Sequence, residues 1–127
     1  MSQRLLQGSI VRAEIPDPQG RNLKLRPVLI YTPTDEIDPT GFIDVVAITT
    51  QVGSFPQDVS VPIPWQRGGH PRTTLNQPNE AICVWVARIP TGTVQTPVGR
   101  VPLKEMTQIL CVLFRFQAPP SAEETST

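Results

Sequence analysis

The chain has 127 residues, with 11 basic and 11 acidic side chains that give a formal net charge of zero at neutral pH. A balanced charge excludes a global field that would draw nucleic acid or an anionic membrane to the whole surface, so any anion site must be local. Hydrophobic residues make up 39% of the chain, which excludes a disordered protein, and the 15 prolines disfavour long helices. Length and composition therefore predict one compact domain built mainly from short strands and turns.

Five segments have the pattern of β-strands. Residues 9–15 alternate in the way that is typical of a half-buried strand, and they end at a Pro-Asp-Pro turn. Residues 42–49 form a β-branched run that predicts a strand buried on both faces. We expect the other strands at 27–32, at 58–63 as a proline-containing edge strand, and at 80–89.

The hydrophobic period changes after residue 101. Apolar residues at steps of three and four predict one amphipathic helix over 102–116, on Leu103, Met106, Ile109, Leu110 and Leu113. Residues 117–127 are small, polar and proline-containing, and we expect a disordered tail there. The expected organisation is thus a single domain over 1–116, of the mainly β, small-barrel class, closed by one C-terminal α-helix.

The strand at 80–89 is expected to be buried on both faces. Alternation places Ile82, Val84 and Val86 on one face and Cys83, Trp85 and Ala87 on the other. Trp85 is accordingly expected in the core or in a dimer interface.

The two cysteines, Cys83 and Cys111, both stand in apolar surroundings. We expect buried reduced thiols rather than a disulfide. No segment has the pattern of a signal peptide or of a membrane span, so a cytoplasmic protein that does not enter the membrane is expected.

Two expected loops carry basic side chains. The first, at 19–25, leads into the second strand and brings Arg21 and Lys24 close to Arg26. The second, at 65–79, is long and polar, and loops of that length in a compact domain are often functional. It holds Trp65, Arg67, His70 and Arg72 around a pair of glycines.

Several stretches together resemble one family. The order Gly8-Ser9-Ile10-Val11, Asp17-Pro18, Gly20 and then Arg26-Pro27-Val28-Leu29-Ile30 is similar to the opening of the MazF/PemK (Kid) family of toxin endoribonucleases. Downstream, Ile48-Thr49-Thr50-Gln51 resembles that family's threonine/serine motif, and Gly99-Arg100-Val101 resembles the glycine before its C-terminal helix. The similarity extends over about residues 8–113.

The resemblance implies an SH3-like barrel, a homodimer, cleavage of single-stranded RNA without a metal or other cofactor, and a cognate antitoxin protein as partner. It implies catalytic positions at Arg26, Thr49 and Thr50. Arginine suits the stabilisation of a phosphorane, because its planar fork stays charged and can hold two phosphate oxygens. A surface arginine at a strand edge and strand-terminal threonines favoured by β-propensity are the structural alternatives.

The sequence departs from the family on the strand at 80–89. Many members carry an arginine there, with an acid two residues later, whereas this chain has Glu80-Ala81-Ile82-Cys83 and no arginine before Arg88. Two side chains are candidate substitutes in catalysis: His70, the single histidine of the chain, and Glu80, which could act as a base. The alternatives are a solvated loop histidine and an exposed charge at a strand end.

Further residues are candidate RNA contacts. Gln51 could read a base edge, and Trp65 could stack on an unpaired base or cap the core beneath its loop. The basic side chains expected to contact phosphates are Arg21, Lys24, Arg67 and Arg72.

Three functions stay open at this point. The first is a metal-independent, sequence-selective endoribonuclease toxin. The second is a catalytically degenerate family member that binds nucleic acid, RNA or DNA, or a protein. The third keeps the fold but poisons a protein target, as some toxins of this barrel type act on DNA gyrase.

No cluster of His, Cys, Asp and Glu has metal-ligand spacing, and no phosphate loop or Gly-x-Ser-x-Gly motif occurs, so metalloenzymes, nucleotide hydrolases and serine hydrolases are not supported.

Overall fold

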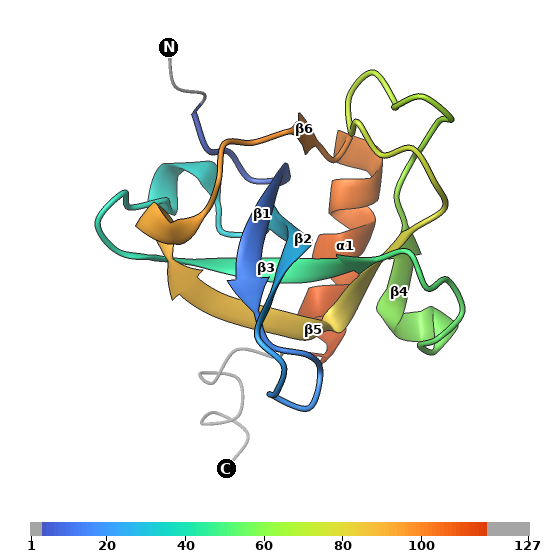
Figure 1. Ribbon diagram of the computed structural model, residues 1–127, viewed down its shortest axis with the longest axis horizontal. Coiled ribbons are helices and arrows are strands. Elements are labelled where there is room, and N and C mark those ends of the chain that lie inside the picture. Colours follow the sequence, from blue (N-terminus) through green and yellow to red (C-terminus); the bar gives the residue numbers. More distant parts are fainter. Residues whose placement is uncertain (1–3, 117–127) are drawn as a thin grey trace.

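A computed structural model describes residues 4–116 of the chain. Six strands form one antiparallel sheet in the order β4-β5-β3-β2-β1-β6, and one helix follows them (Figure 1). The strands are β1 (Ser9–Ile15), β2 (Lys24–Ile30), β3 (Phe42–Thr49), β4 (Ser60–Pro62), β5 (Glu80–Pro90) and β6 (Gly99–Arg100), and the helix is α1 (Leu103–Phe116). Short 3-10 turns at Thr34–Glu36, Gln57–Val59 and Thr91–Thr93 connect them.

The mainly β fold with one C-terminal helix is confirmed, and most element positions agree with the sequence pattern. β1 and β3 have the expected bounds, β5 and α1 differ by one residue, and β2 begins three residues earlier than expected. The strand expected at 58–63 is shorter, because a 3-10 turn occupies its start. The two-residue strand β6 was not expected, since nothing in its composition distinguishes it from a loop. The tail expected at 117–127 lies outside the described residues, and the domain boundaries stay a prediction.

Two apolar clusters lie on opposite sides of the curled sheet. The β1–β2 pair crosses the β3–β5 pair, and α1 lies against β5 and β4 (Figure 1). The first cluster joins the helix residues Met106, Ile109 and Leu113 to the sheet. The second is enclosed by the sheet itself, mainly by alternate residues of β1, β2 and β3. Both faces of β3 are buried, which explains why its β-branched residues form a continuous run rather than alternating with polar ones.

An irregularity in β5 changes which side chains share a face. Val46 of β3 pairs with Val86, but the next residue, Ala47, pairs with Ile82, so three residues of β5 are inserted at this point. As a result Cys83 packs in the helix-side cluster, whereas Trp85 and Ala87 pack against the opposite one. The expectation that Cys83, Trp85 and Ala87 share one face is therefore wrong, because simple alternation does not pass through a bulge.

Two further burial expectations are corrected. Cys83 is buried, but Cys111 lies on the exposed side of α1. Val84, expected in the core, is 49% exposed, since the irregularity turns it outward. Burial raises the pKa of the Cys83 thiol to about 11 because the thiolate would lose its hydration.

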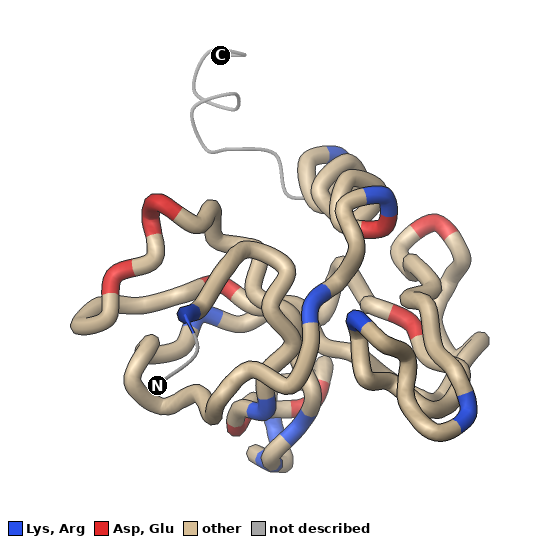
Figure 2. Tube along the Cα trace, turned by 90° about the horizontal axis from the view of Figure 1, so that it is seen from above, with Lys and Arg blue, Asp and Glu red and all other residues tan. Residues whose placement is uncertain are grey.

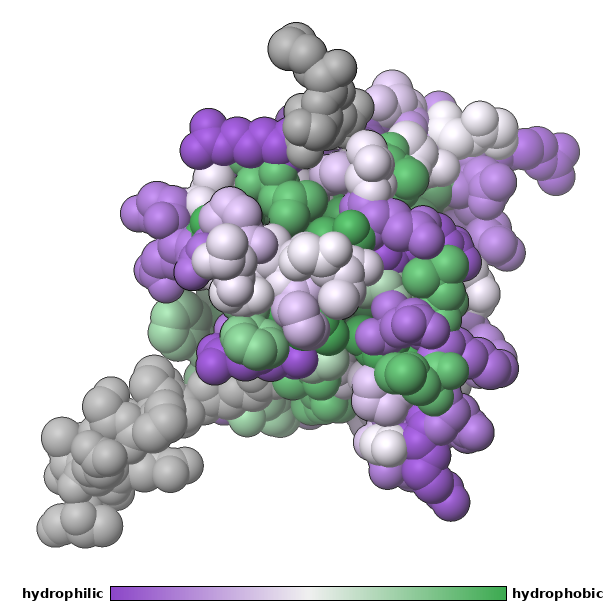
Figure 3. Space-filling model, turned by 60° about the vertical axis from the view of Figure 1, so that its left-hand side comes forward, coloured by the Kyte–Doolittle hydropathy of each residue, from purple (hydrophilic) through white to green (hydrophobic). Residues whose placement is uncertain are grey.

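The surface is mixed in both charge and polarity. Lys and Arg, and Asp and Glu, occur on several sides of the molecule, so neither sign of charge is confined to one face (Figure 2). On the face shown in Figure 3, apolar residues reach the surface in patches separated by hydrophilic ones. Within residues 4–116 there is no helix of the length and apolar character that crossing a membrane requires.

Candidate nucleic-acid interface

A groove of about 780 Å³ lies where β1, β2, the end of β3 and β5 meet the long 64–79 loop. Three basic side chains and one acidic side chain line it: Arg12, Lys24, Arg26 and Asp17. Polar hydroxyl and amide side chains complete the lining, namely Thr49, Thr50, Gln51, Thr74, Asn76, Gln77 and Asn79. The groove thus combines local positive charge with hydrogen-bonding groups, although the chain as a whole is neutral.

Arg26 is held at the groove by its own strand and by the turn before it. It stands on β2 opposite Ala13 of β1, inside the strand rather than at its start, because β2 begins earlier than the sequence pattern predicts. Its Nε donates to the carbonyl of Ile15 at 3.2 Å, and one terminal nitrogen donates to the carbonyl of Asn22 at 3.0 Å. The guanidinium is therefore oriented by the backbone and keeps further N–H groups for a ligand.

Trp85 and Phe55 form an aromatic pair beside Arg26. The Arg26 guanidinium carbon lies 5.2 Å from the Trp85 ring centroid, which is a cation–π contact. Phe55 stacks on the same tryptophan with 6.1 Å between ring centroids and an interplanar angle of 28°. The indole N–H donates to the carbonyl of Pro16 at 2.9 Å. Trp85 therefore lines the groove as well as packing against the second apolar cluster, because the β5 irregularity turns it toward β2.

The turn after β3 presents Thr49, Thr50 and Gln51 to the groove. The Thr49 hydroxyl accepts a hydrogen bond from the Gln51 backbone N–H at 3.1 Å, which fixes the start of the turn. Thr49 pairs with Glu80 on β5, and the Glu80 carboxylate accepts from the Gly53 backbone N–H at 3.2 Å. Glu80 thus lies behind this turn and holds it, and it is not among the residues that line the groove.

Asp17 supports the loop between β1 and β2. Its carboxylate accepts hydrogen bonds from the backbone N–H groups of Arg21 and Gln19 and from the side chain of Asn22. These bonds, with the one from Arg21 first, lower the pKa of Asp17 below its usual value. The loop can therefore turn back sharply and place β2 with its basic residues beside β1.

Besides Glu80, four other residues expected at the site are not part of the groove lining: Arg21, Trp65, Arg67 and His70. Arg21 and Arg67 are exposed on loops, and Trp65 is 43% exposed. His70 has a local role, since its Nδ1 accepts hydrogen bonds from the backbone N–H groups of Arg72 and Thr73. A fifth residue, Arg72, lines a neighbouring cavity.

Sequence reasoning missed several groove residues. The alternation of residues 9–15 predicts only a strand for Arg12, and no sequence pattern marks Phe55. The amides of Asn76, Gln77 and Asn79 looked like ordinary loop residues, although Asn79 is 3% exposed and its Oδ1 has no hydrogen-bond partner within the described chain. The burial of Asn79 depends on tertiary contacts, so the local sequence offered no signal that would distinguish it from an ordinary loop residue.

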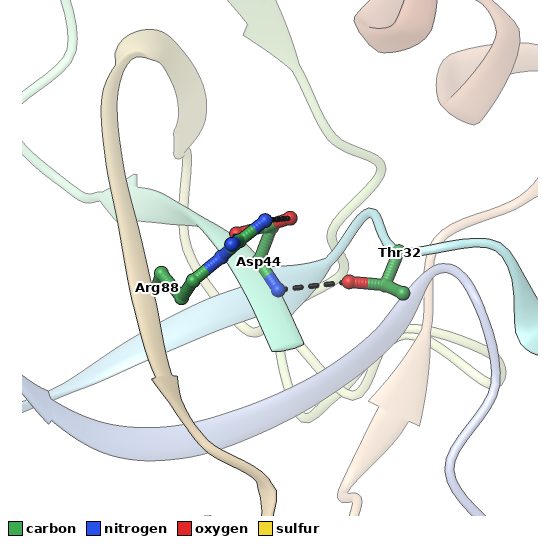
Figure 4. A network of polar contacts seen from close by, with 3 residues as sticks. All are labelled: Thr32, Asp44 and Arg88. Carbon is green, nitrogen blue, oxygen red and sulfur yellow. Dashed lines mark hydrogen bonds and ion pairs between the residues drawn. The ribbon is translucent and has the colours of Figure 1, made fainter. Parts of the chain in front are cut away.

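Arg88, the arginine of β5, belongs to a different part of the sheet. It forms a two-point ion pair with Asp44 across the strands, at 2.9 and 3.1 Å, and the Asp44 backbone N–H donates to the Thr32 hydroxyl (Figure 4). The arginine side of the pair is exposed, and neither Asp44 nor Arg88 is among the residues that line the groove. β5 therefore brings no arginine to the groove.

Comparison with solved structures identifies the fold. MazF from Deinococcus radiodurans superposes with a TM-score of 0.67 at 14% identity, covering 94% of this chain and 99% of that one. This chain has the MazF fold. An endoribonuclease from a mycobacterial species gives a TM-score of 0.66 at 15% identity, with 94% and 97% of the two chains covered. A MazF toxin from Mycobacterium tuberculosis gives 0.58 at 21% identity over 84% and 93%. No family model matches the sequence, and no curated protein matches it.

The MazF-like fold is thus shared at low sequence identity. Two of the similar structures are complexes: MazE–MazF from Deinococcus radiodurans, and a mycobacterial endoribonuclease with its cognate antitoxin. In residues 4–116 of this chain, no group of three or more His, Cys, Asp and Glu side chains is arranged to hold a metal ion.

Proposed function

We propose that this chain is a metal-independent, sequence-selective endoribonuclease that cleaves single-stranded RNA and acts as the toxin of a toxin–antitoxin pair. The observation that carries the proposal is the oriented Arg26 guanidinium over Trp85, in the same groove as Thr49 and Thr50, within a MazF fold. We further propose that it acts in the cytoplasm as a homodimer.

RNA supplies its own nucleophile, and this defines what the groove must do. The 2′-hydroxyl attacks the adjacent phosphorus, a new P–O bond forms, and the bond to the 5′-oxygen breaks, which leaves a cyclic phosphate and a 5′-hydroxyl. Negative charge develops on the phosphorane oxygens, and the Arg26 fork neutralises it. The exposed Thr50 hydroxyl donates a hydrogen bond to the same phosphate.

The groove offers fewer groups for proton transfer than for binding the phosphate. Its described lining has no histidine, and its carboxylate, Asp17, has a lowered pKa and three hydrogen bonds that hold it as an anion. A carboxylate of low pKa is a poor general base. We therefore propose that solvent takes the 2′-hydroxyl proton and gives a proton to the leaving 5′-oxygen, and that orientation and charge supply most of the acceleration. Because no group of the protein then titrates in the reaction, the cleavage rate should rise with pH without a bell-shaped maximum.

Selectivity is assigned to the amide side chains around the groove. Gln51, Asn76 and Gln77 are exposed and line it. Their donors and acceptors suit the edges of unpaired bases, which is how proteins read single-stranded RNA. The aromatic surface of Phe55 and Trp85 offers a place for a base to stack.

An antitoxin is the proposed protein partner. MazF of Deinococcus radiodurans has a structure with MazE, and one mycobacterial endoribonuclease has a structure with its cognate antitoxin. The shared fold supports a partner of the same kind for this chain.

The deciding experiment is incubation of the purified protein with a long single-stranded RNA in EDTA, followed by mapping of new 5′ ends. Cuts at a recurring sequence are expected, and Arg26→Ala should lower the cleavage rate by about 100-fold or more. Arg26→Lys keeps the charge but loses the fork, so it should recover only part of the rate. Arg115→Ala, at an exposed position of α1 away from the groove, is the matched control and should cut normally.

A second function is a binding module that has the fold but does not cleave. It is favoured by the same absence of a histidine and of an available carboxylate base in the described groove lining. RNA that binds to the folded wild-type protein, free of antitoxin, and stays intact would establish this function and exclude the nuclease.

A further inference from the structure

A second cavity of about 300 Å³ is lined by three arginines from three separate segments of the chain. Arg4 comes from the segment before β1, Arg72 from the 64–79 loop, and Arg100 from β6. The rest of its described lining is uncharged, so no carboxylate offsets the three positive charges there. Arginines so far apart in sequence meet only because the fold brings these segments together.

A close backbone contact joins two of these segments. The Arg100 backbone N–H donates to the Arg72 carbonyl at 2.9 Å. Gly99 permits this contact, since a Cβ at that position would lie 2.3 Å from the carbonyl oxygen of Thr73. The 64–79 loop is thereby attached to β6, and the two arginines stand at fixed backbone positions beside one another.

The guanidinium groups are largely available to a ligand. Among the described residues, no hydrogen bond or ion pair engages the side chains of Arg4 and Arg72, and Arg100 donates one N–H to the carbonyl of Gln7 at 3.3 Å. All three residues are exposed. Arginine forks of this kind suit the oxygens of a phosphate, which can accept two parallel hydrogen bonds from each.

The second cavity continues the groove. Thr74 and Val98 line both spaces, so the two share a wall. Basic side chains therefore follow one path across the surface: Lys24, Arg26 and Arg12 in the groove, then Arg72, Arg100 and Arg4 beyond Val98. A continuous basic path beside a site for unpaired bases is what a single-stranded nucleic acid requires.

We propose that Arg4, Arg72 and Arg100 form a second phosphate-binding site, which holds the backbone of the RNA strand as it leaves the cleavage groove. This inference rests on the proposed function for the identity of the strand. The site lengthens the contact along the RNA by one or more phosphates and contributes affinity without reading a base.

The test measures binding of fluorescent single-stranded RNA at several salt concentrations, with a long oligonucleotide and with one too short to leave the groove. The logarithm of the binding constant for a single strand falls linearly with the logarithm of the salt concentration, with a slope of about 0.7 per phosphate contact. Arg72→Gln should lower the slope for the long RNA by about 0.7 and its affinity by about tenfold, with no effect on the short one. Arg4→Gln should do the same, and Arg115→Gln is the matched control. Urea unfolding of each variant verifies its fold.

The outcomes separate this inference from the proposed function. Unchanged slopes in Arg4→Gln and Arg72→Gln, with RNA still cut, would overturn the second site and leave the nuclease standing. Reduced slopes without any cleavage by the wild type would support the site and remove the nuclease. Absence of RNA binding would overturn both. If these variants instead weakened the binding of polyglutamate and left the RNA slope unchanged, the site would belong to an acidic protein and the assignment to RNA would fail.

Discussion

The guanidinium carbon of Arg26 lies 5.2 Å from the centroid of the Trp85 ring, and each residue is also tied to the segment that joins β1 and β2. Arg26 donates to Ile15 and Asn22, and Trp85 donates to Pro16. β2 and β5, which are not neighbours in the sheet, therefore meet at this point. The contact fixes the basic side of the groove.

Substitution of Trp85 tests this contact. Trp85→Phe keeps a ring but loses the N–H bond to Pro16, and the free energy of unfolding should fall by about 1 kcal/mol. Trp85→Leu also loses the cation–π contact and should lower it by about 2 kcal/mol. If Trp85 positions Arg26, cleavage should fall in the same order, measured at a temperature where all three proteins stay folded. Equal cleavage by the wild type and Trp85→Leu would show that Arg26 does not depend on the ring.

The contact between Arg26 and Trp85 also shows which features of the fold and of the groove the sequence could predict. The alternation of β1, the continuous β-branched run of β3 and the helical period of α1 come from burial within one element, so they were predictable. The position of Trp85 depends on an irregularity between Val46 and Ala47 that has no signature in the local sequence. Groove residues such as Arg12 and Asn79 come from separate elements, and only their tertiary arrangement brings them together.

Glu80 offers a test of catalysis against positioning. Its carboxylate accepts a hydrogen bond from the Gly53 N–H and holds the turn that follows Thr49. Glu80→Gln keeps an acceptor oxygen at the same place but cannot act as a base, and we expect it to cut RNA at a rate near that of the wild type. Glu80→Ala loosens the turn and should cut several-fold more slowly. A Glu80→Gln protein that is folded but inactive would instead identify Glu80 as the general base.

His70 can be tested with a substitution that preserves its local bonds. Its Nδ1 accepts from the backbone N–H groups of Arg72 and Thr73. Asparagine commonly accepts from backbone groups in the same way, so His70→Asn should keep both the loop and the cleavage activity. His70→Ala removes the acceptor, and its free energy of unfolding should fall by about 1 kcal/mol. Loss of cleavage in a stable His70→Asn protein would assign the histidine a chemical role.

The two cysteines should differ sharply in reactivity. Cys111 is exposed, whereas burial of Cys83 raises the pKa of its thiol to about 11. Because the thiolate is the reactive form, a maleimide at neutral pH should label Cys111 rapidly and Cys83 only after unfolding. Cys111→Ser should remove the rapid phase, and mass spectrometry after digestion identifies the labelled position. Rapid labelling of Cys83 in the folded protein would contradict the packing of β5 against α1.

Gly99 should be essential to the attachment of the 64–79 loop to β6. A Cβ at this position would lie 2.3 Å from the Thr73 carbonyl oxygen and 2.8 Å from that of Arg72. Neither oxygen belongs to a flexible side chain, so the loop or the strand must move. Gly99→Ala should therefore lower the free energy of unfolding by about 2 kcal/mol in urea. Gly92→Ala is the matched control, since nothing lies within 4 Å of its added Cβ and it should be nearly neutral. Equal stabilities of the two variants would show that the loop adapts at no cost, and in that case the backbone contact between Arg72 and Arg100 would not hold their positions fixed.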